Sequence, residues 1–292
     1  MSAPRNSGSA GGKRFYTLPT GEKFWSVTTI IGGGLPKPAL LPWGIKSVAE
    51  VAVAKRKTLM AMTGECEGGE CGPGQWCSSC DAAVRWLKSA PYQQRDKAAD
   101  LGTKIHEAAE AYKLGKPAPP WPDDVAPTMV GFERWLAALS PTFIQTEASV
   151  YNRAQRYAGT LDAIIEIPLT DAIRQMALGT TWRIPTDRDF LRILLDYKSG
   201  KAIYSEVALQ LAAYRFSEFI ALPDGKEAPV PEVDGAAALH LRPNSATFID
   251  VLADDEVFRA FLYVREGFRW MEELSKTVIG AELIPASIQE AA

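Results

Sequence analysis

The sequence predicts an α/β (α+β) domain, in which a mixed central sheet is flanked by helices and preceded by an N-terminal helical lobe. Up to residue 140 the apolar residues mostly recur with the period of a helix, about 3.6 residues. From residue 142 the period falls toward two, and Val, Ile, Thr and aromatic residues become frequent, as in strands. Helices, then strands around one helix, then a last helix are typical of a sheet covered by helices.

Composition describes a soluble globular chain that is long enough to bury a large core, with 292 residues of which 47% are hydrophobic and 23% charged. The N-terminus lacks an apolar stretch of signal-peptide length, and no run reaches the roughly 18 apolar residues of a membrane-spanning helix. We therefore expect a cytoplasmic protein without a membrane partner. We also expect a disordered tail over 1–14 and a single domain over 15–292, with a cysteine-rich insert at 63–82 and a sheet-containing core at 142–250.

Charge is distributed unevenly along the chain, although the net charge is only -3. Residues 1–62 hold nine Lys or Arg against two Glu, a local +7 that leaves -10 for the remainder. A basic lobe beside an acidic body suits a protein that meets phosphates on one surface and holds cations on another. A solvated basic face on a helix is an equally good explanation of the charge alone.

The expected elements follow from local patterns. SVTTII predicts a strand, and PTMVGFERWLAALS a helix before the sheet. Two further helices flank residues 91–95, and LTDAIRQMALGTTWRIPTDRD at 169–189 has no clear assignment. The expected strands are 26–31, 143–152, 157–167, 190–200, 236–243 and 246–252, and the expected helices are 39–57, 82–90, 96–115, 127–140, 204–220 and 254–276.

The strand LLDYKSG ends in a carboxylate and an ammonium group. Alternate residues of a strand share a face, so Asp196 and Lys198 point together, away from Tyr197. In GTLDAIIEI the same rule sets Asp162 and Ile164 on the face opposite Leu161, Ala163, Ile165 and Ile167. Neighbouring buried carboxylates imply a shared proton or a bound cation, and a hard divalent ion is the simpler answer.

Two histidines could add a nitrogen ligand. His106 lies just inside a helix that a Gly-Thr turn introduces; taken alone, such a histidine is more often a hydrogen-bonded, partly buried residue than a metal ligand. His240, on an expected strand, is interpreted as a hydrogen-bonded structural residue.

The four cysteines fall within fifteen residues, with the spacing C-x4-C-x5-C-x2-C. Glycine-rich spacers let such a segment surround one ion, and thiolates accept Zn²⁺ or an iron-sulfur cluster. Disulfides are rare in the cytosol, but disulfide-bonded or unligated cysteines remain open. The candidate ligands are Cys66, Cys71, Cys77 and Cys80.

Five short motifs in order resemble the PD-(D/E)XK nuclease superfamily, in its RecB-like branch with CRISPR-associated and phage exonucleases. They are Gly102-Thr103 with His106, Glu147 in TEASVYN, Asp162 in GTLDAI, Asp196 with Lys198 in LDYKSG, and Gln210 with Tyr214 in QLAAY. The opening SVTTIIGGGLPKPALLPW also resembles phage members. The resemblance touches most of residues 26–220, whereas residues 221–292 carry no motif of the family.

The resemblance implies a restriction-endonuclease-like core that binds Mg²⁺ or Mn²⁺. Its ligands would be His106, Asp162, Asp196 and the carbonyl of Tyr197. Lys198 would orient and activate the attacking water. Glu147 would act on metal-bound water, and Gln210 and Tyr214 would position Lys198 or contact DNA. Some relatives carry a 4Fe–4S cluster whose cysteines lie on both sides of the core; here all four precede His106, which favours structural zinc.

The expected function is therefore metal-dependent DNA exonuclease activity in phage or bacterial recombination or repair. DNA would be the substrate, and a recombinase, a single-strand-binding protein or a helicase would be partners. Two alternatives stay open: a non-catalytic DNA-binding or adaptor protein on a nuclease-like fold, and an endonuclease of the same superfamily.

Overall fold

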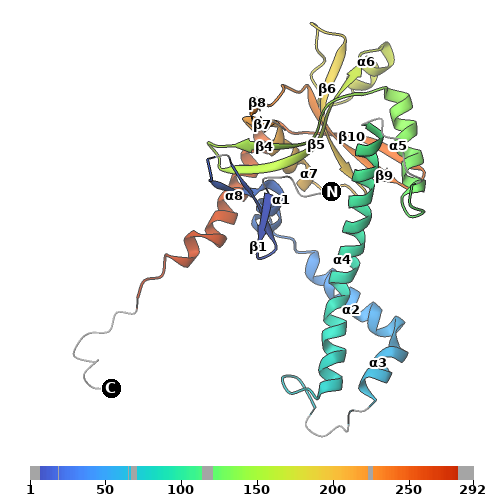
Figure 1. The fold of residues 1–292 in the computed structure, drawn as a ribbon, viewed down its shortest axis with the longest axis vertical. Coiled ribbons are helices and arrows are strands. Elements are labelled where there is room, and N and C mark those ends of the chain that lie inside the picture. The colour runs from blue at the N-terminus through green and yellow to red at the C-terminus, as the bar shows by residue number, and fades with distance from the viewer. Residues whose placement is uncertain are drawn as a thin grey trace, which may run out of the picture.

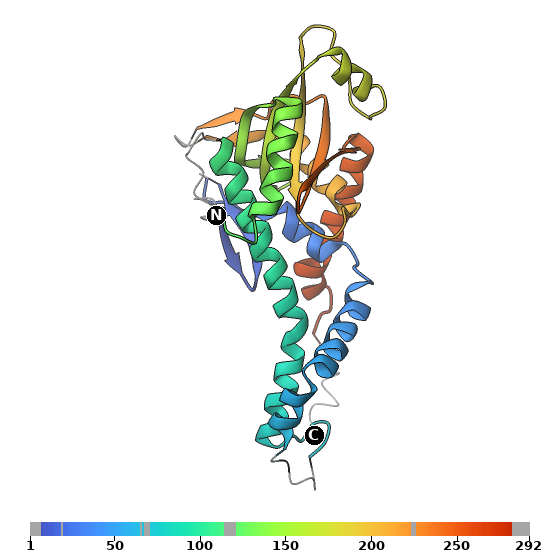
Figure 2. The same cartoon turned by 90° about the vertical axis from the view of Figure 1, so that its right-hand side faces the viewer.

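The computed structural model describes residues 7–18, 20–64, 66, 71–113, 121–222 and 226–281. An open mixed sheet has helices on both faces, and a helical arm extends from it (Figures 1 and 2). The mixed α/β architecture and the preceding helical lobe are thus as predicted.

The elements that precede the central strands form a small sheet edge, the arm and two helices, α1 and α5, that cover the sheet. The arm consists of α2, α3 and most of α4, which lie side by side in both ribbon views. The bounds are β1 Ser7–Ala10, β2 Lys13–Thr17, β3 Lys23–Ser26, α1 Val27–Gly34, α2 Leu40–Ala54, α3 Arg56–Thr63, α4 Ser78–Lys113 and α5 Ala126–Leu139.

The N-terminal segment departs from the expected disordered tail over 1–14. Residues 7–10 form β1, which pairs antiparallel with β2, and the turn between them uses Gly11 and Gly12 at positive φ. Glycine adopts these angles without steric cost, so a Ser/Gly-rich stretch can close a hairpin. Residues 1–6 lie outside the described part of the chain.

The segment SVTTII is also not the expected strand. The strand ends at Ser26, whose hydroxyl accepts a hydrogen bond from the Thr29 backbone N–H at 3.0 Å and caps α1. Such a cap typically contributes about 1 kcal/mol. Val27, Ile30 and Ile31 then lie on one helical face and enter the core, so packing overrides the strand preference of their branched side chains.

A single helix of 36 residues, α4, replaces the two helices expected around residues 91–95. Pro91 lies inside it. The Gly-Thr pair at 102–103 is helical too and forms no turn. A Cβ on Gly102 would meet the Ser199 hydroxyl oxygen at 3.3 Å, so the glycine allows α4 to lie close to the loop that follows residue 198.

The central strands follow the predicted order. The returning hairpin and the capped final helix are also present, with Asp254 accepting from the Val257 N–H at 3.0 Å. The expected helix 204–220 ends earlier, and its last residues form a short strand against β4. The bounds are β4 Thr142–Asn152, β5 Tyr157–Pro168, α6 Asp171–Ala177, β6 Phe190–Lys198, α7 Glu206–Arg215, β7 Phe219–Ala221, β8 Glu227–Pro229, β9 Gly235–Arg242, β10 Ser245–Val251, α8 Asp255–Glu272 and a 3₁₀ turn Leu274–Lys276.

The sheet divides at β5, because two different strands, β3 and β6, pair with different parts of the same side of β5. Strand β4 pairs antiparallel along one side of β5. On the other side, β3 pairs parallel with residues 157–158, and β6 pairs antiparallel with residues 163–168. Strand β9 then lies parallel to β6, which gives the sheet its mixed character.

Two apolar cores cover the two faces of the sheet. On one face, α1, α7 and α8 pack against side chains that include Leu161, Ile164 and Leu194. On the other, α5, α6 and the C-terminal part of α4 cover a second set of residues, which includes Ala163 and Tyr197. No helix in the described ranges has the length and apolar character needed to cross a membrane.

Candidate active site and cysteine cluster

The point where the sheet divides positions Asp162. The ladders of β5 with β3 and β6 leave residues 159–162 without a strand partner on that side. The carboxylate of Asp162 accepts a hydrogen bond from the Tyr197 N–H at 2.7 Å, so a side chain closes part of the gap. An acidic group is thereby held at the end of β6 rather than in its paired middle.

The strand β5 changes its facing at this same residue. Leu161 packs with Ile164 in one core, whereas Ala163 packs in the other, so the predicted grouping of Leu161 with Ala163 is wrong. Opposite this point, Glu147 of β4 has a φ of 47°. A left-handed residue interrupts the regular alternation of its own strand, so both strands are irregular at this point of the sheet.

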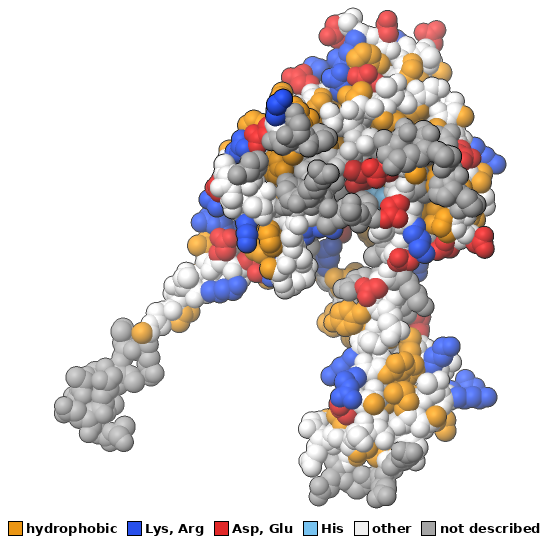
Figure 3. Space-filling view, viewed as in Figure 1, with side chains coloured by type: hydrophobic (Ala, Val, Ile, Leu, Met, Phe, Trp, Pro, Cys, Tyr) orange, Lys and Arg blue, Asp and Glu red, His pale blue; other side chains and the backbone are white. Residues whose placement is uncertain are grey.

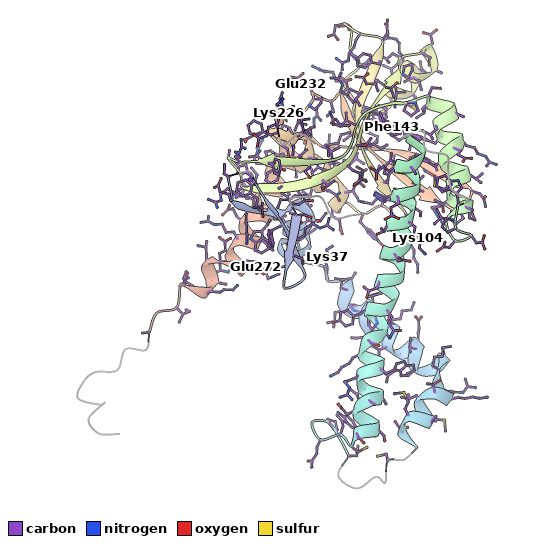
Figure 4. All side chains as sticks on the ribbon, viewed as in Figure 1. Lys37, Lys104, Phe143, Lys226, Glu232 and Glu272 are labelled. Atoms are coloured by element: carbon purple, nitrogen blue, oxygen red, sulfur yellow. The ribbon has the colours of Figure 1, made fainter. Side chains whose placement is uncertain are left out.

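His106 reaches the site from α4, whose upper part runs past the sheet where Figure 4 labels Lys104. Its Nδ1 lies 3.8 Å from Asp162 Oδ2 and 3.9 Å from Glu147 Oε1, and its ring meets that of Tyr197 edge-on at 5.5 Å. Both Nδ1 distances exceed those of hydrogen bonds. Nδ1 is buried and finds no hydrogen-bond partner among the described residues.

The electrostatics of this group favour a positive charge. Burial alone would lower the pKa of His106, but the carboxylates of Asp162, Glu147 and Asp196 outweigh it and raise the pKa to about 9. In Figure 3, acidic side chains gather around a small patch of histidine surface just above the arm.

The three residues also satisfy the spacing of a metal site. Ligand atoms of His106, Glu147 and Asp162 all lie within 4.8 Å of one another. An ion bonded at about 2.0 to 2.6 Å holds its ligand atoms about 3 to 5 Å apart. Two carboxylates and one imidazole, with an orphaned nitrogen aimed at them, therefore fit a hard divalent cation such as Mg²⁺ or Mn²⁺.

Asp196 and Lys198 form a second cluster with α7. The ammonium group of Lys198 lies 2.7 Å from one Asp196 oxygen and 2.9 Å from the other. Gln210 donates to Asp196 Oδ1 at 2.8 Å and accepts from Lys198 at 3.3 Å, and its amide also donates to the Tyr214 hydroxyl at 3.4 Å. The predicted common face of Asp196 and Lys198, and that of Gln210 and Tyr214, are thus present.

Burial and charge act against each other in this cluster. Burial raises the pKa of Asp196 to about 6 and the Asp162 charge adds to it, against the opposing charge of Lys198. Burial would lower the pKa of Lys198, but the charges of Asp196 and Asp162 raise it above its ordinary value. Lys198 is therefore an ammonium group at neutral pH.

The structure brings together all eight residues expected at the active site, with two differences in their arrangement. Glu147, expected to act only on metal-bound water, belongs to the group with ligand spacing. Asp196, expected as a ligand, is not a member of that group and is bonded to Lys198 and Gln210. The eight residues are His106, Glu147, Asp162, Asp196, Tyr197, Lys198, Gln210 and Tyr214.

Further residues that support the site had no strong sequence signal. Nε2 of His240 makes a 2.7 Å hydrogen bond to the Gly200 carbonyl and ties down the loop after Lys198, in agreement with the structural interpretation of this histidine. The hydroxyls of Tyr16 and Thr160 bond at 2.8 Å beside the gap in β5. A tyrosine near the N-terminus could not be linked to the site by spacing along the chain.

The four cysteines converge at the far end of the arm. Their sulfur atoms all lie within 4.8 Å of one another, and none forms a disulfide. Cys66 follows α3, and Cys80 lies in the first turn of α4. A turn closed by hydrogen bonds between Gly72 and Gln75 lets the Cys77 N–H donate to Cys71 Sγ at 3.3 Å. Within the predicted insert, residues 65 and 67–70 lie outside the described part of the chain.

The thiols of Cys77 and Cys80 have different pKa values, and a bound cation would stabilise all four cysteines as thiolates. A hydrogen bond from the Cys80 backbone lowers the pKa of Cys77 to about 7. The neighbouring sulfurs of Cys66, Cys71 and Cys77 raise the pKa of Cys80. Four thiolates cannot share so small a space without a positive ion between them, so this cluster could bind a metal such as zinc.

Comparison of the chain with protein-family models and with curated proteins found no match.

Proposed function

We propose that the protein is a metal-dependent DNA exonuclease that hydrolyses phosphodiester bonds. The observation that carries the proposal is the meeting of two clusters at the divided sheet: His106, Glu147 and Asp162 with ligand spacing, and an ammonium group on the neighbouring strand. A hard cation beside a fixed amine is an arrangement suited to attack on a phosphate.

The residues around the proposed cation have distinct tasks. His106, Glu147 and Asp162 would hold Mg²⁺ or Mn²⁺, and Asp196 and the Tyr197 carbonyl border that group at the end of β6. When bound, the metal lowers the pKa of water and offsets charge on the phosphate. The Tyr197 N–H fixes one oxygen of Asp162, so this carboxylate keeps its orientation.

Lys198 would act on the substrate directly. Its ammonium group is held by Asp196 and Gln210, with 30% of its side chain exposed. A fixed positive charge next to the scissile phosphate stabilises negative charge that develops on the phosphate oxygens and orients the attacking water. Gln210, which Tyr214 contacts, would position the ammonium group.

For the cysteine cluster we propose structural zinc, with a 4Fe–4S cluster as the alternative. A tetrahedral zinc ion with Zn–S bonds of about 2.3 Å places sulfur atoms about 3.8 Å apart, which fits four sulfurs within 4.8 Å. Metal analysis with an absorption spectrum separates the two: zinc leaves the protein colourless, whereas the cluster gives a brown protein that absorbs in the visible.

The test of the nuclease proposal is a comparison of Lys198→Ala with Lys201→Ala, an exposed lysine three residues away. With Mn²⁺ and linear DNA, wild type and Lys201→Ala should release nucleotides, and EDTA should stop both. Lys198→Ala should slow hydrolysis by about 100-fold or more while the Kd for DNA changes less than about twofold.

Three other results would each contradict a part of the proposal: hydrolysis itself, the requirement for DNA ends, or the role of Lys198. Binding of DNA by the wild type without hydrolysis in Mg²⁺ or Mn²⁺ favours the adaptor alternative. Cleavage of closed circular DNA favours an endonuclease. Loss of both binding and hydrolysis in Lys198→Ala removes the role given to the lysine.

A further inference from the structure

A separate pocket lies where β3, the turn between β4 and β5, and α8 meet, and its cavity has a volume of about 450 Å³. This size is within the range of small-ligand sites, roughly 300 to 1,000 Å³. None of the active-site residues lines it. Its walls include Lys23, Trp25, Arg156, Arg265, Phe268 and Arg269.

Positive charge dominates the pocket. Four of its lining residues are cationic, and Glu273 is the acidic one. Arg269 is paired with Glu266 and Glu273, at 3.4 and 3.7 Å. Lys23 and Arg156 have no acidic partner among the described residues, and their contacts are with the rings of Phe15 and Phe24, at 4.9 and 5.7 Å.

Arg265 is fixed in place with a donor to spare. One terminal nitrogen donates to the Gln155 carbonyl at 2.7 Å, and the other pairs with Glu266. Its Nε is buried and has no hydrogen-bond partner among the residues described. An unsatisfied guanidinium donor in a pocket costs about 1 to 3 kcal/mol, and an oxygen of a bound anion would satisfy it.

The pocket also has an aromatic wall. Trp25, which is partly buried, meets Phe268 edge-on with ring centroids 5.8 Å apart. Cations beside a flat apolar surface suit a phosphate that carries a sugar, because the sugar can pack against the rings while the phosphate is neutralised.

We propose that this pocket binds the phosphate of a nucleotide, and that the nucleotide belongs to the DNA strand whose end enters the site at Asp162; this assignment of the source rests on the proposed function. Arg156 immediately precedes β5, six residues before Asp162. Six strand residues span about 20 Å. Successive phosphates of one duplex strand are about 3.4 Å apart along the axis, so the pocket lies about six nucleotides from the scissile bond.

The experiment measures binding without hydrolysis, in EDTA, by fluorescence anisotropy of two labelled DNA hairpins. One stem has about four base pairs and the other about sixteen, so that only the second spans both sites. The variants are Arg156→Asn and Arg265→Gln, with Arg259→Gln, an exposed arginine of the same helix α8, as the control. Asparagine tolerates the φ of 54° at position 156, so Arg156→Asn tests the charge even if Arg265→Gln unfolds.

For the long hairpin, Arg156→Asn should weaken binding about fivefold and reduce the slope of log K against log salt by about one, because one phosphate contact is lost. The short hairpin should bind to Arg156→Asn as tightly as to the wild type. The control variant Arg259→Gln should bind both hairpins as the wild type does. A second arm titrates ADP by calorimetry. If ADP binding is lost in both pocket variants while DNA binding is unchanged, the phosphate site stands and its source is a free nucleotide.

The pocket proposal is overturned if both variants bind the long hairpin and ADP as the wild type does. Because neither arm needs hydrolysis, this result is distinct from a failure of the nuclease proposal. If the pocket variants weaken binding as expected but the wild type does not hydrolyse DNA, the phosphate-site proposal is supported and the nuclease proposal is refuted.

Discussion

Gly159 shows how one small residue sets the geometry of the lysine cluster. A Cβ at this position would lie 2.5 Å from a ring carbon of Tyr214, closer than side chains can approach. Tyr214 is buried and contacts Gln210, which holds Lys198. The glycine of the GTLD motif therefore has a packing role in addition to its place beside Asp162.

We expect Gly159→Ala to displace Tyr214 and to destabilise the protein by about 1 to 3 kcal/mol, as overpacking of a core does. Activity should fall further than the loss of folded protein explains, because Gln210 loses its support. Thermal unfolding and hydrolysis per folded molecule check this. Gly179→Ala is the control, since a Cβ there meets its nearest atom at an ordinary 3.6 Å; equal effects of the two substitutions would refute the packing role.

The Asp196–Lys198 pair should show strong coupling. Asp196 is 1% exposed, so Asp196→Ala leaves an ammonium group without its main partner and should cost about 3 kcal/mol. The double variant Asp196→Ala, Lys198→Met should be more stable than Asp196→Ala alone, because it leaves no unpaired charge. Urea unfolding of the wild type, the two single variants and the double variant measures the coupling. If the two single changes in the free energy of unfolding simply add, the pair is solvated and uncoupled.

At the residue scale, the sequence predicts side chains that obey strand alternation. Asp196 and Lys198 were found together for this reason. The side of Leu161 could not be predicted, because the change of face in β5 accompanies the left-handed backbone of Glu147, and glutamate carries no sequence signal for that conformation. For the same reason, strand alternation could not predict that Glu147 lies among the residues with ligand spacing.

At the scale of elements, α4 connects the two candidate metal sites. Cys80 lies near its first residue and His106 near its last turns, 26 positions apart. At about 1.5 Å per residue these positions are about 39 Å apart. The sequence predicts two helices with a break at residues 91–95, and Pro91 is a residue that usually interrupts a helix, but packing of α4 against α2 and α3 favours continuity.

This separation predicts the effect of removing a metal ion from the proposed site at the four cysteines. A thiol-reactive chelator, or Cys77→Ser, should loosen the contacts of α2 and α3 with α4 and increase proteolysis of the arm. Hydrolysis of a dinucleotide, which needs only the site at His106, should change less than about twofold, since 39 Å of helix intervenes. Limited proteolysis and kinetics check both effects, with Ser78→Ala as the control; loss of dinucleotide hydrolysis would show that the cysteine cluster supports the catalytic site itself.

At the scale of the whole molecule, the arm carries exposed cations and the body carries the acidic site. Lys55, Arg56 and Lys57 are all exposed at the junction of α2 and α3, and basic side chains are visible along the arm in Figure 3. The arm extends below the sheet in both ribbon views. The sequence predicts this imbalance of charge and a basic helix, but not that the helix would extend away from the sheet as part of an arm.

We expect the arm to bind the phosphates of a DNA duplex beyond the catalytic site. Reversal of two charges, in Lys55→Glu with Arg56→Glu, should weaken binding of long duplexes and lower the slope of log K against log salt by about two, at about 0.9 per phosphate contact. Hydrolysis of a dinucleotide should be unchanged, because these residues lie on the arm.

The control is Arg242→Glu with Arg259→Glu, which changes two exposed arginines of β9 and α8 and makes the same change in net charge. If this control lowers the slope equally, the effect is one of overall charge and the arm has no specific role, whereas a decrease confined to the arm variant means that its cations contact DNA.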